Sequence, residues 1–178
     1  MLIRPAVAGD ASALARIYGH HVLHGVGTFE EAAPDAAGML ARMEAVTKHG
    51  LPYLVADDAG RVVGFAYAGP FRTRAAYRYT VEDSVYIDPD RTRRGIGKAL
   101  LAEVIAACEA LGMRQMLALI GDSANAGSIG LHLALGFREA GVGRALGFKQ
   151  GRWVDVVWMR RPLGAGEATA PTGPGLEL

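Results

Sequence analysis

A segment rich in glycine and arginine stands directly before a predicted helix, and its sequence is Arg91-Thr92-Arg93-Arg94-Gly95-Ile96-Gly97-Lys98-Ala99. The free backbone N–H groups and the positive dipole end of a helix attract phosphate, and nearby basic side chains strengthen that attraction. These residues therefore predict a phosphate-binding loop. Upstream, Glu82 lies on a predicted strand over residues 80–87, where its carboxylate could exchange a proton with whatever the phosphate-bearing ligand carries.

Two familiar phosphate motifs do not match this loop. A Walker loop needs glycine at position 92 and Ser or Thr at position 99, but Thr92 and Ala99 stand there. A dinucleotide fingerprint needs Gly or Ala at position 100, which is Leu100. The remaining pattern, Gly95 and Gly97 after several arginines, favours a pyrophosphate held without a metal ion. The alternative is an ordinary strand-to-helix turn with solvated arginines.

The composition limits the class of protein. With 178 residues, 51% of them hydrophobic and 21% charged, the chain is long enough for one domain with a sizeable core. A formal net charge of +1 gives no general attraction for nucleic acid or anionic membrane. The single cysteine, Cys108, fits a reducing compartment, and no apolar run reaches the roughly 20 residues that span a bilayer. We expect a cytoplasmic protein without a membrane, nucleic acid or metal partner.

Hydrophobic periodicity predicts alternating strands and helices. Strands are expected near residues 2–4, 53–56, 62–68, 80–87 and 116–120, with two more in a long hairpin over 142–159. Helices are expected after the N-caps Asp10 and Asp35, over 95–111 with Leu111 on its buried stripe, and over 126–135. Residues 164–178, rich in Gly, Ala, Pro and Thr, are predicted to be a mobile tail after a domain over 1–163.

The segment from Val85 to Leu101 resembles the acetyl-coenzyme A motif of the GCN5-related N-acetyltransferases (GNAT), written Gln/Arg-x-x-Gly-x-Gly/Ala. Four further segments, 68–72, 80–86, 131–137 and 147–153, are similar to the phosphinothricin and methionine sulfoximine/sulfone acetyltransferases of that family. They occur in the same order, within residues 1–163. The chain departs from the motif at Thr92, where the family has Gln or Arg. Arg91 or Arg93 would have to supply the missing charge.

The resemblance implies an α/β (α+β) fold with a central, mixed, mostly antiparallel and twisted sheet of about seven strands and helices on both faces. It implies an acetyl-coenzyme A-dependent N-acetyltransferase, without a metal, acting on the α-amine of a small amino acid analogue such as phosphinothricin, methionine sulfoximine or methionine sulfone. The amine would attack directly in a ternary complex. The resemblance also implies antibiotic or herbicide resistance and a homodimer packed through the late hairpin. The alternatives are a GNAT enzyme for a protein N-terminus or a polyamine, and a non-catalytic acyl-coenzyme A sensor.

Acetyl transfer to an amine needs a base for the ammonium proton, donors for the oxyanion and a proton for the departing thiolate. Glu82 is the predicted base; otherwise it is a solvated edge residue or a partner of Arg78. His132 occupies a position where many relatives have a tyrosine, and it is a candidate acid or base. The alternative for His132 is a packed, hydrogen-bonded helix residue.

The predicted cofactor contacts combine the loop with positions implied by the resemblance. They are Val85, Tyr86, Ile87, Arg91, Thr92, Arg93, Arg94, Gly95, Ile96, Gly97, Lys98, Ala99, Asn125 and Ser128. A backbone N–H on the strand of residues 85–87 is the expected oxyanion donor. Asn125 and Ser128 could equally be helix-capping residues.

Two separate cationic anchors would suit a substrate with a carboxylate and an oxygenated tip. Arg72 and Arg78 are the preferred anchors and Arg74 is a weaker candidate, whereas solvated surface arginines are the alternative. The predicted substrate-binding residues are Phe29, Arg72, Arg78, Thr80 and Lys149. No metal is expected from His20, His21 and His24, because no third ligand with suitable spacing accompanies them.

Overall fold

The protein is described by a computed structural model that covers residues 1–178. Its strands are β1 (Leu2–Pro5), β2 (Tyr53–Asp58), β3 (Arg61–Pro70), β4 (Thr80–Ile87), β5 (Gln115–Gly121), β6 (Arg138–Lys149) and β7 (Arg152–Pro162). Its α-helices are α1 (Ala11–His24), α2 (Ala36–Thr47), α3 (Ile96–Ala110) and α4 (Ala126–Ala134), and a short 3-10 helix, η2 (Ala75–Tyr77), precedes β4. None of the helices combines the length and the apolar character needed to cross a membrane.

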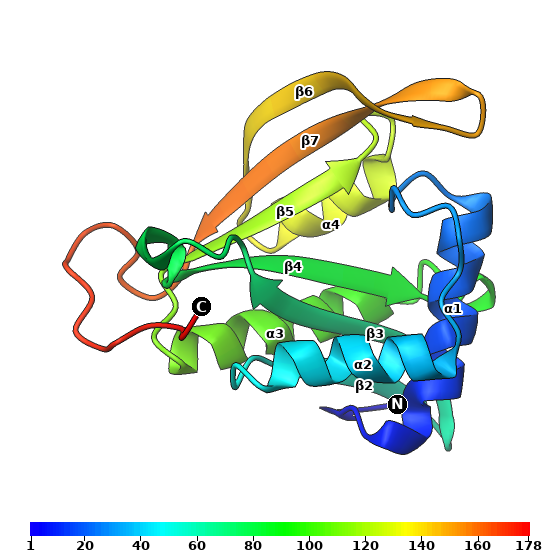
Figure 1. Cartoon of the computed structure of the whole chain (residues 1–178), viewed down its shortest axis with the longest axis horizontal. Helices are drawn as coiled ribbons and strands as arrows, with labels where there is room; N and C mark the ends of the chain where they lie inside the picture. Colours follow the sequence, from blue (N-terminus) through cyan, green and yellow to red (C-terminus); the bar gives the residue numbers. More distant parts are fainter.

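The strands form one seven-stranded sheet in the order β1-β2-β3-β4-β5-β7-β6 (Figure 1). Every neighbouring pair is antiparallel except β4 and β5, which are parallel. The prediction of a mixed, mostly antiparallel sheet of about seven strands is therefore confirmed.

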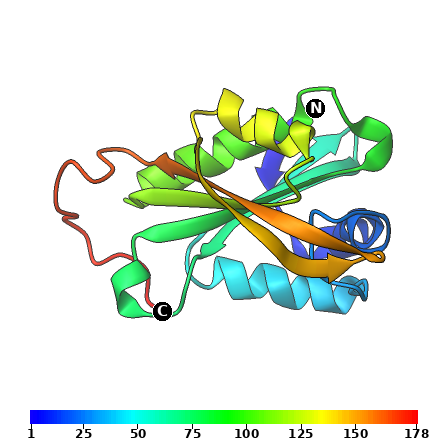
Figure 2. The same cartoon turned by 90° about the horizontal axis from the view of Figure 1, so that it is seen from above.

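The helices cover both faces of this sheet, as predicted: α1 and α2 lie on one face and α3 and α4 on the other (Figure 2). Successive residues of a strand point to opposite faces. Phe65 of β3 accordingly packs in one core with Leu14 of α1, whereas the next residue, Ala66, packs in the other core with Leu100 of α3.

The parallel pair β4–β5 is short. Its register is limited to Thr80 with Gln115, Val81 with Met116 and Glu82 with Leu117. Beyond Glu82, β4 stays paired with β3 as far as Ile87, and β5 stays paired with β7 as far as Gly121. The two strands therefore separate in the middle of the sheet, and the edge of β4 that faces β5 has no ladder partner there.

Local capping explains where the predicted elements agree with the structure and where they differ. Asp35 caps α2 by accepting a 2.8 Å hydrogen bond from the Gly38 N–H. Asp10 makes no such bond to α1, because its carboxylate is occupied by Arg4 and the Val7 N–H. The prediction that Leu111 is buried is wrong: α3 ends one residue earlier, and Leu111 is 47% exposed.

Residues 164–178 contain no helix or strand, but they contact the folded domain. The Arg114 guanidinium donates to the Gly166 carbonyl at 2.8 Å, the Tyr79 hydroxyl to the Gly173 carbonyl at 2.6 Å, and the Leu176 N–H to the Arg78 carbonyl at 2.8 Å. The predicted mobility of this tail stays a prediction. Two of these contacts, those to Arg78 and Tyr79, are in the segment that leads from η2 into β4.

Candidate active site

A cavity of about 440 Å³ lies where β4 and β5 separate. Its walls come from β4, the loop before α3, the first turn of α3, β5 and α4. All the predicted cofactor contacts line it except Arg94 and Ala99, and His132 lines it as well. The separated strands, rather than the loop alone, create this space.

The first turn of α3 presents backbone donors to the cavity. Gly95 has φ 77°, a left-handed conformation that glycine adopts without strain, and no side chain caps the helix. The Ala99 N–H reaches back to the Gly95 carbonyl, so the N–H groups of the residues between them have no acceptor within the helix. Such a turn binds phosphate through its N–H groups and the helix dipole.

The basic side chains of the loop are engaged to different degrees. Arg91 lies 3.5 Å from the carboxylate of Asp58, whereas Arg93 and Arg94 are exposed and form no ion pair. The Thr92 hydroxyl donates to the Pro89 carbonyl at 3.5 Å. Arg93 is therefore the arginine on the cavity wall with the most freedom to meet a phosphate.

The start of α4 forms another part of the wall. Asn125 accepts a hydrogen bond from the Ser128 N–H at 3.1 Å and donates to the Gly121 carbonyl at 3.0 Å. Asn125 is thus a helix cap, and both residues also line the cavity. The two readings of these positions are compatible.

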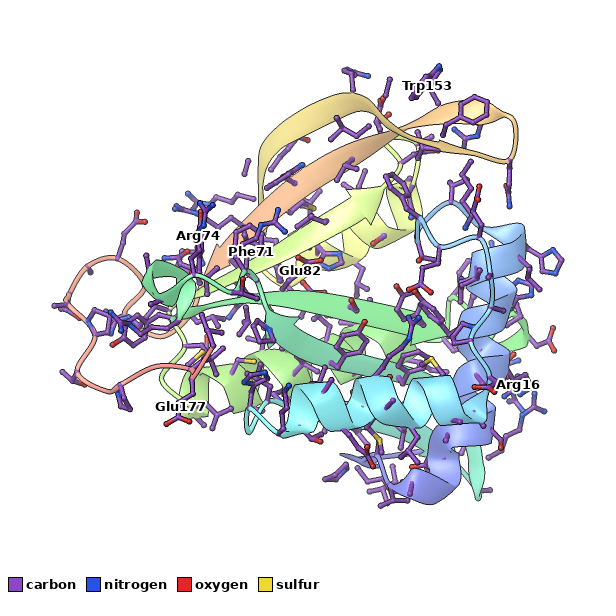
Figure 3. The ribbon with its side chains drawn as sticks, viewed as in Figure 1. Arg16, Phe71, Arg74, Glu82, Trp153 and Glu177 are labelled. Carbon is purple, nitrogen blue, oxygen red and sulfur yellow. The ribbon has the colours of Figure 1, made fainter.

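Glu82 lies at the closed end of the separation and is not part of the cavity wall. It is on the sheet face that α1 covers, because Tyr86, four residues along β4, packs against Tyr18 with ring centroids 4.8 Å apart. Burial and the negative charge of Asp83 raise the pKa of Glu82, and the charge of Arg72 opposes this shift. Its carboxylate is therefore a stronger base than an exposed glutamate. In Figure 3, Phe71 and Arg74 lie near the start of β4, and Glu82 lies further along the sheet.

His132 is bonded through both ring nitrogens. Its Nδ1–H donates to the Ser128 carbonyl at 2.7 Å, and its Nε2 lies 3.0 Å from Oδ2 of Asp83. Asp83 also lines the cavity, and the sequence analysis did not identify it. Neither ring nitrogen is free in this arrangement, and the role of His132 as an acid or base stays a prediction.

None of the predicted substrate residues lines the cavity. The guanidinium of Arg72 stacks on Phe71 at 4.6 Å, and that of Arg78 lies 5.7 Å from the Tyr79 ring. Both arginines are exposed and neither forms an ion pair, so both remain open to an anionic ligand. Thr80 opens β4 opposite Gln115. The three residues belong to one segment, which leads to Glu82.

Phe29 and Lys149 lie where the β6–β7 hairpin contacts the segment between α1 and α2. The Lys149 ammonium is buried and donates to the Thr28 carbonyl at 2.8 Å. The Phe29 ring lies against Gly147 so closely that a Cβ at that glycine would be 2.5 Å from it. Both side chains join the β6–β7 hairpin to the segment between α1 and α2.

His21 is a further wall residue that the sequence analysis did not select. Its Nε2–H donates to the Ile87 carbonyl at 2.8 Å, at the end of β4. The spacing of the three histidines on α1 predicted no metal site and gave no other role for His21. No local signal marks His21, because its partner is 66 positions away.

Comparison with protein-family models identifies residues 19–137 as the acetyltransferase (GNAT) family. The chain belongs to the GNAT family. The separated β4 and β5 and the uncapped turn of α3 are the parts of this GNAT domain that surround the 440 Å³ cavity.

Individual relatives extend over nearly the whole GNAT chain. A phosphinothricin N-acetyltransferase from Alcaligenes faecalis is 52% identical over 162 residues, which are 91% of this chain and 82% of that protein. An L-methionine sulfoximine/L-methionine sulfone acetyltransferase from Salmonella typhimurium is 39% identical over 163 residues, 92% of this chain and 95% of that protein. A phosphinothricin acetyltransferase from Sinorhizobium meliloti, solved in complex with acetyl-coenzyme A, has a TM-score of 0.94 at 50% identity and covers 98% of this chain and 94% of its own.

Proposed function

We propose that this GNAT domain transfers the acetyl group of acetyl-coenzyme A to the α-amine of a small amino acid analogue of the phosphinothricin, methionine sulfoximine or methionine sulfone type. The observation that carries the proposal is the separation of β4 and β5 beside the uncapped turn of α3. It brings the first turn of α3, with its free N–H groups, and the unpaired edge of β4 to one cavity, beside the half-buried Glu82.

The residues fit a coenzyme with a pyrophosphate. The N–H groups of the first turn of α3 and the side chain of Arg93 would hold the phosphates without a metal ion. The free edge of β4 over residues 85–87 would donate hydrogen bonds to the pantetheine arm and to the thioester oxygen. Coenzyme binding to the similar Sinorhizobium meliloti enzyme supports this placement.

Glu82 supplies the base. An ammonium has no lone pair, so Glu82 accepts the amine proton, directly or through a water molecule, before the nitrogen attacks the thioester carbonyl carbon. The raised pKa of Glu82 increases its proton affinity, which suits this step near neutral pH. The C–S bond then breaks, the attacking nitrogen loses its second proton, and the departing thiolate takes up that proton, so that an amide and free coenzyme A form.

Substrate choice rests on the segment before β4. Arg72 and Arg78 offer two cationic anchors, one for a carboxylate and one for an oxygenated tip. A cationic polyamine would be repelled by the same side chains. The names of the relatives from Alcaligenes faecalis and Salmonella typhimurium support an amino acid analogue, and a role in resistance to such compounds follows from that choice.

We also propose a homodimer and a cytoplasmic location. Leu146, Phe148 and Trp153 are 59%, 59% and 64% exposed on the β6–β7 hairpin, and the two aromatic rings pack edge-to-face at 5.3 Å. A second copy of the chain would bury these apolar side chains. The free, buried Cys108 is compatible with a reducing compartment.

Thiol release from acetyl-coenzyme A tests the function. The purified chain is assayed with phosphinothricin, methionine sulfoximine and methionine sulfone, and in parallel with a peptide and spermidine. We expect turnover with at least one of the three analogues and little with spermidine. Turnover with the peptide or spermidine alone would reject the substrate class, and no turnover with any amine despite coenzyme binding would favour a sensor.

A further inference from the structure

The hydrogen bonds of His132 determine how many protons it shares with Asp83. The Ser128 carbonyl can only accept, so Nδ1 of His132 carries a proton. Nε2 faces Oδ2 of Asp83 at 3.0 Å. Either His132 is an imidazolium that donates to a carboxylate, or a protonated Asp83 donates to a neutral ring. In both cases the pair holds one proton more than a neutral histidine beside a carboxylate would.

The surroundings favour retention of that proton. The side chains of His132 and Asp83 are only 3% and 2% exposed. Burial alone would lower the pKa of His132, but the hydrogen bond and charge of Asp83, together with the Ser128 carbonyl, outweigh it and raise the pKa. Burial likewise raises the pKa of Asp83, although the bond to His132 opposes this.

Few other ionisable groups act on the pair. Glu82 precedes Asp83 on β4 and turns to the other face of the sheet, and it remains close enough for the charge of Asp83 to raise its pKa. Cys108 of α3 is near enough for the charge of Asp83 to act on it, and burial raises the pKa of its thiol to about 12, so it stays neutral. On the remaining side the Phe137 ring packs edge-on against His132, with centroids 4.9 Å apart. Asp83 is therefore the counter-ion of His132.

The pair also occupies a particular place in the sheet. Glu82 and Leu117 are the last residues that join β4 to β5, and Asp83 comes directly after them. His132 lies on α4, the helix that follows β5 in the chain. The Asp83–His132 bond therefore links β4 to α4 at the point where the strand pairing stops, and both residues line the cavity.

We propose that Asp83 is a positioning residue that keeps His132 as an imidazolium, and that this buried pair fixes α4 against β4 so that the cavity keeps the shape acetyl-coenzyme A requires. That acetyl-coenzyme A is the ligand rests on the proposed function. The extra proton on the Asp83–His132 pair does not. Because both ring nitrogens are already hydrogen-bonded, His132 holds α4 in place in the cavity wall. Glu82 alone exchanges a proton with the amine.

Two variants separate this role from that of a proton donor. In Asp83→Asn the side-chain amide donates to a neutral Nε2, so the bond survives without the extra proton. In Asp83→Ala the bond is lost. Asp35→Asn, which can still cap the exposed start of α2, is the matched control. The dissociation constant for acetyl-coenzyme A and the kcat are measured from pH 6 to 10.

We expect Asp83→Ala to weaken acetyl-coenzyme A binding about tenfold, with kcat at saturation changed less than about threefold. Asp83→Asn should bind about as tightly as the natural chain at neutral pH. A raised pKa means that the imidazolium is present at low pH and is lost as pH rises through that pKa. Binding to the natural chain should therefore weaken at high pH, and binding to Asp83→Asn should not.

Nitrogen-15 NMR of labelled histidine reads the proton count without turnover, with the His132 signals assigned by their loss in His132→Asn. The natural chain should show both His132 nitrogens protonated at pH 7, and Asp83→Asn should show a proton on Nδ1 alone. An unprotonated Nε2 in the natural chain would overturn the imidazolium. A large loss of kcat in Asp83→Asn with unchanged coenzyme binding would overturn the positioning role and make the pair a proton donor. If the natural chain does not bind acetyl-coenzyme A, the proposed function fails while the NMR result still stands.

Discussion

Glu82 and Asp83 are consecutive on β4, but their carboxylates lie on opposite faces of the sheet. Asp83 bonds to His132 of α4, whereas Glu82 shares a face with Tyr86, which packs against α1. Burial raises the pKa of both carboxyls, but only Asp83 has a histidine beside it to oppose the shift. The two neighbouring carboxyl groups therefore differ in their partners and in the opposition to their pKa shifts. In our proposal Glu82 exchanges a proton with the substrate, and Asp83 fixes His132 in the wall of the cavity.

Arg72→Ala should have two effects. The charge of Arg72 lowers the pKa of Glu82, so its removal should raise that pKa further and move the acid limb of the kcat/KM–pH profile to higher pH. Loss of an anchor should also raise the KM for the amino acid about tenfold. Arg78→Ala should raise KM without moving the acid limb, and Arg138→Ala, at an exposed arginine of β6 that forms no ion pair, serves as the matched surface control. An unchanged profile and KM in Arg72→Ala would remove it from the site.

Thr92→Arg restores a residue type that the GNAT coenzyme motif has at this position. The natural side chain makes one long bond to the Pro89 carbonyl, so little is lost by replacing it. A guanidinium there can bind a phosphate through two N–H groups. We expect the KM for acetyl-coenzyme A to fall several-fold, most clearly at low ionic strength, with kcat unchanged. Arg93→Ala should act in the opposite direction. No change in either variant would place the pyrophosphate away from this loop.

The sequence predicted the elements whose signals are local. The sequence pattern predicted a strand over residues 80–87, and the structure has β4 at those residues. Asp35 caps α2 as predicted, because the bonding partner is three residues away. Leu111 follows the periodicity of α3 but lies just before Gly112, whose φ of 77° turns the chain, so periodicity alone overestimated the buried stripe.

The contacts that complete the candidate site are not local. Asp83 meets His132 across 49 positions, His21 meets Ile87 across 66, and Lys149 meets Thr28 across 121. Each depends on which face of the sheet a residue occupies and on the order of the strands. The sequence predicted Lys149 as a substrate-binding residue, and this role stays a prediction. In the structure its buried ammonium donates to the Thr28 carbonyl and so joins two segments that are distant in the sequence.

Lys149→Met tests that contact. Methionine is similar in length but cannot donate a hydrogen bond, so the Thr28 carbonyl would lose its partner. We expect the free energy of unfolding, measured in urea, to fall by about 1–3 kcal/mol. Lys48→Met, at the exposed end of α2, should change it by less than about 0.5 kcal/mol. Unchanged stability with a raised KM for the amino acid would contradict this structural role and support the predicted role of Lys149 in substrate binding.

Removal of residues 164–178 tests whether the tail supports the segment before β4. The truncated chain loses the bonds to the Arg78 carbonyl, the Tyr79 hydroxyl and the Arg114 guanidinium. We expect faster hydrogen exchange over residues 75–79 and a KM for the amino acid raised a few-fold, with acetyl-coenzyme A binding unchanged. Exchange rates that match those of the full chain would mean that the tail is mobile in solution, as its composition predicts.

Glu82→Gln tests the central claim most directly. The amide is nearly the same size as the carboxylate but cannot accept the amine proton, and Glu82 lies outside the coenzyme cavity. The measurement is kcat at pH 7 with saturating acetyl-coenzyme A and the best amino acid analogue, together with the dissociation constant of the coenzyme. The account predicts unchanged coenzyme binding and a kcat reduced about 10²- to 10⁴-fold, recovering in part as pH rises and the free amine becomes available. A kcat equal to that of the natural chain at pH 7 would contradict it.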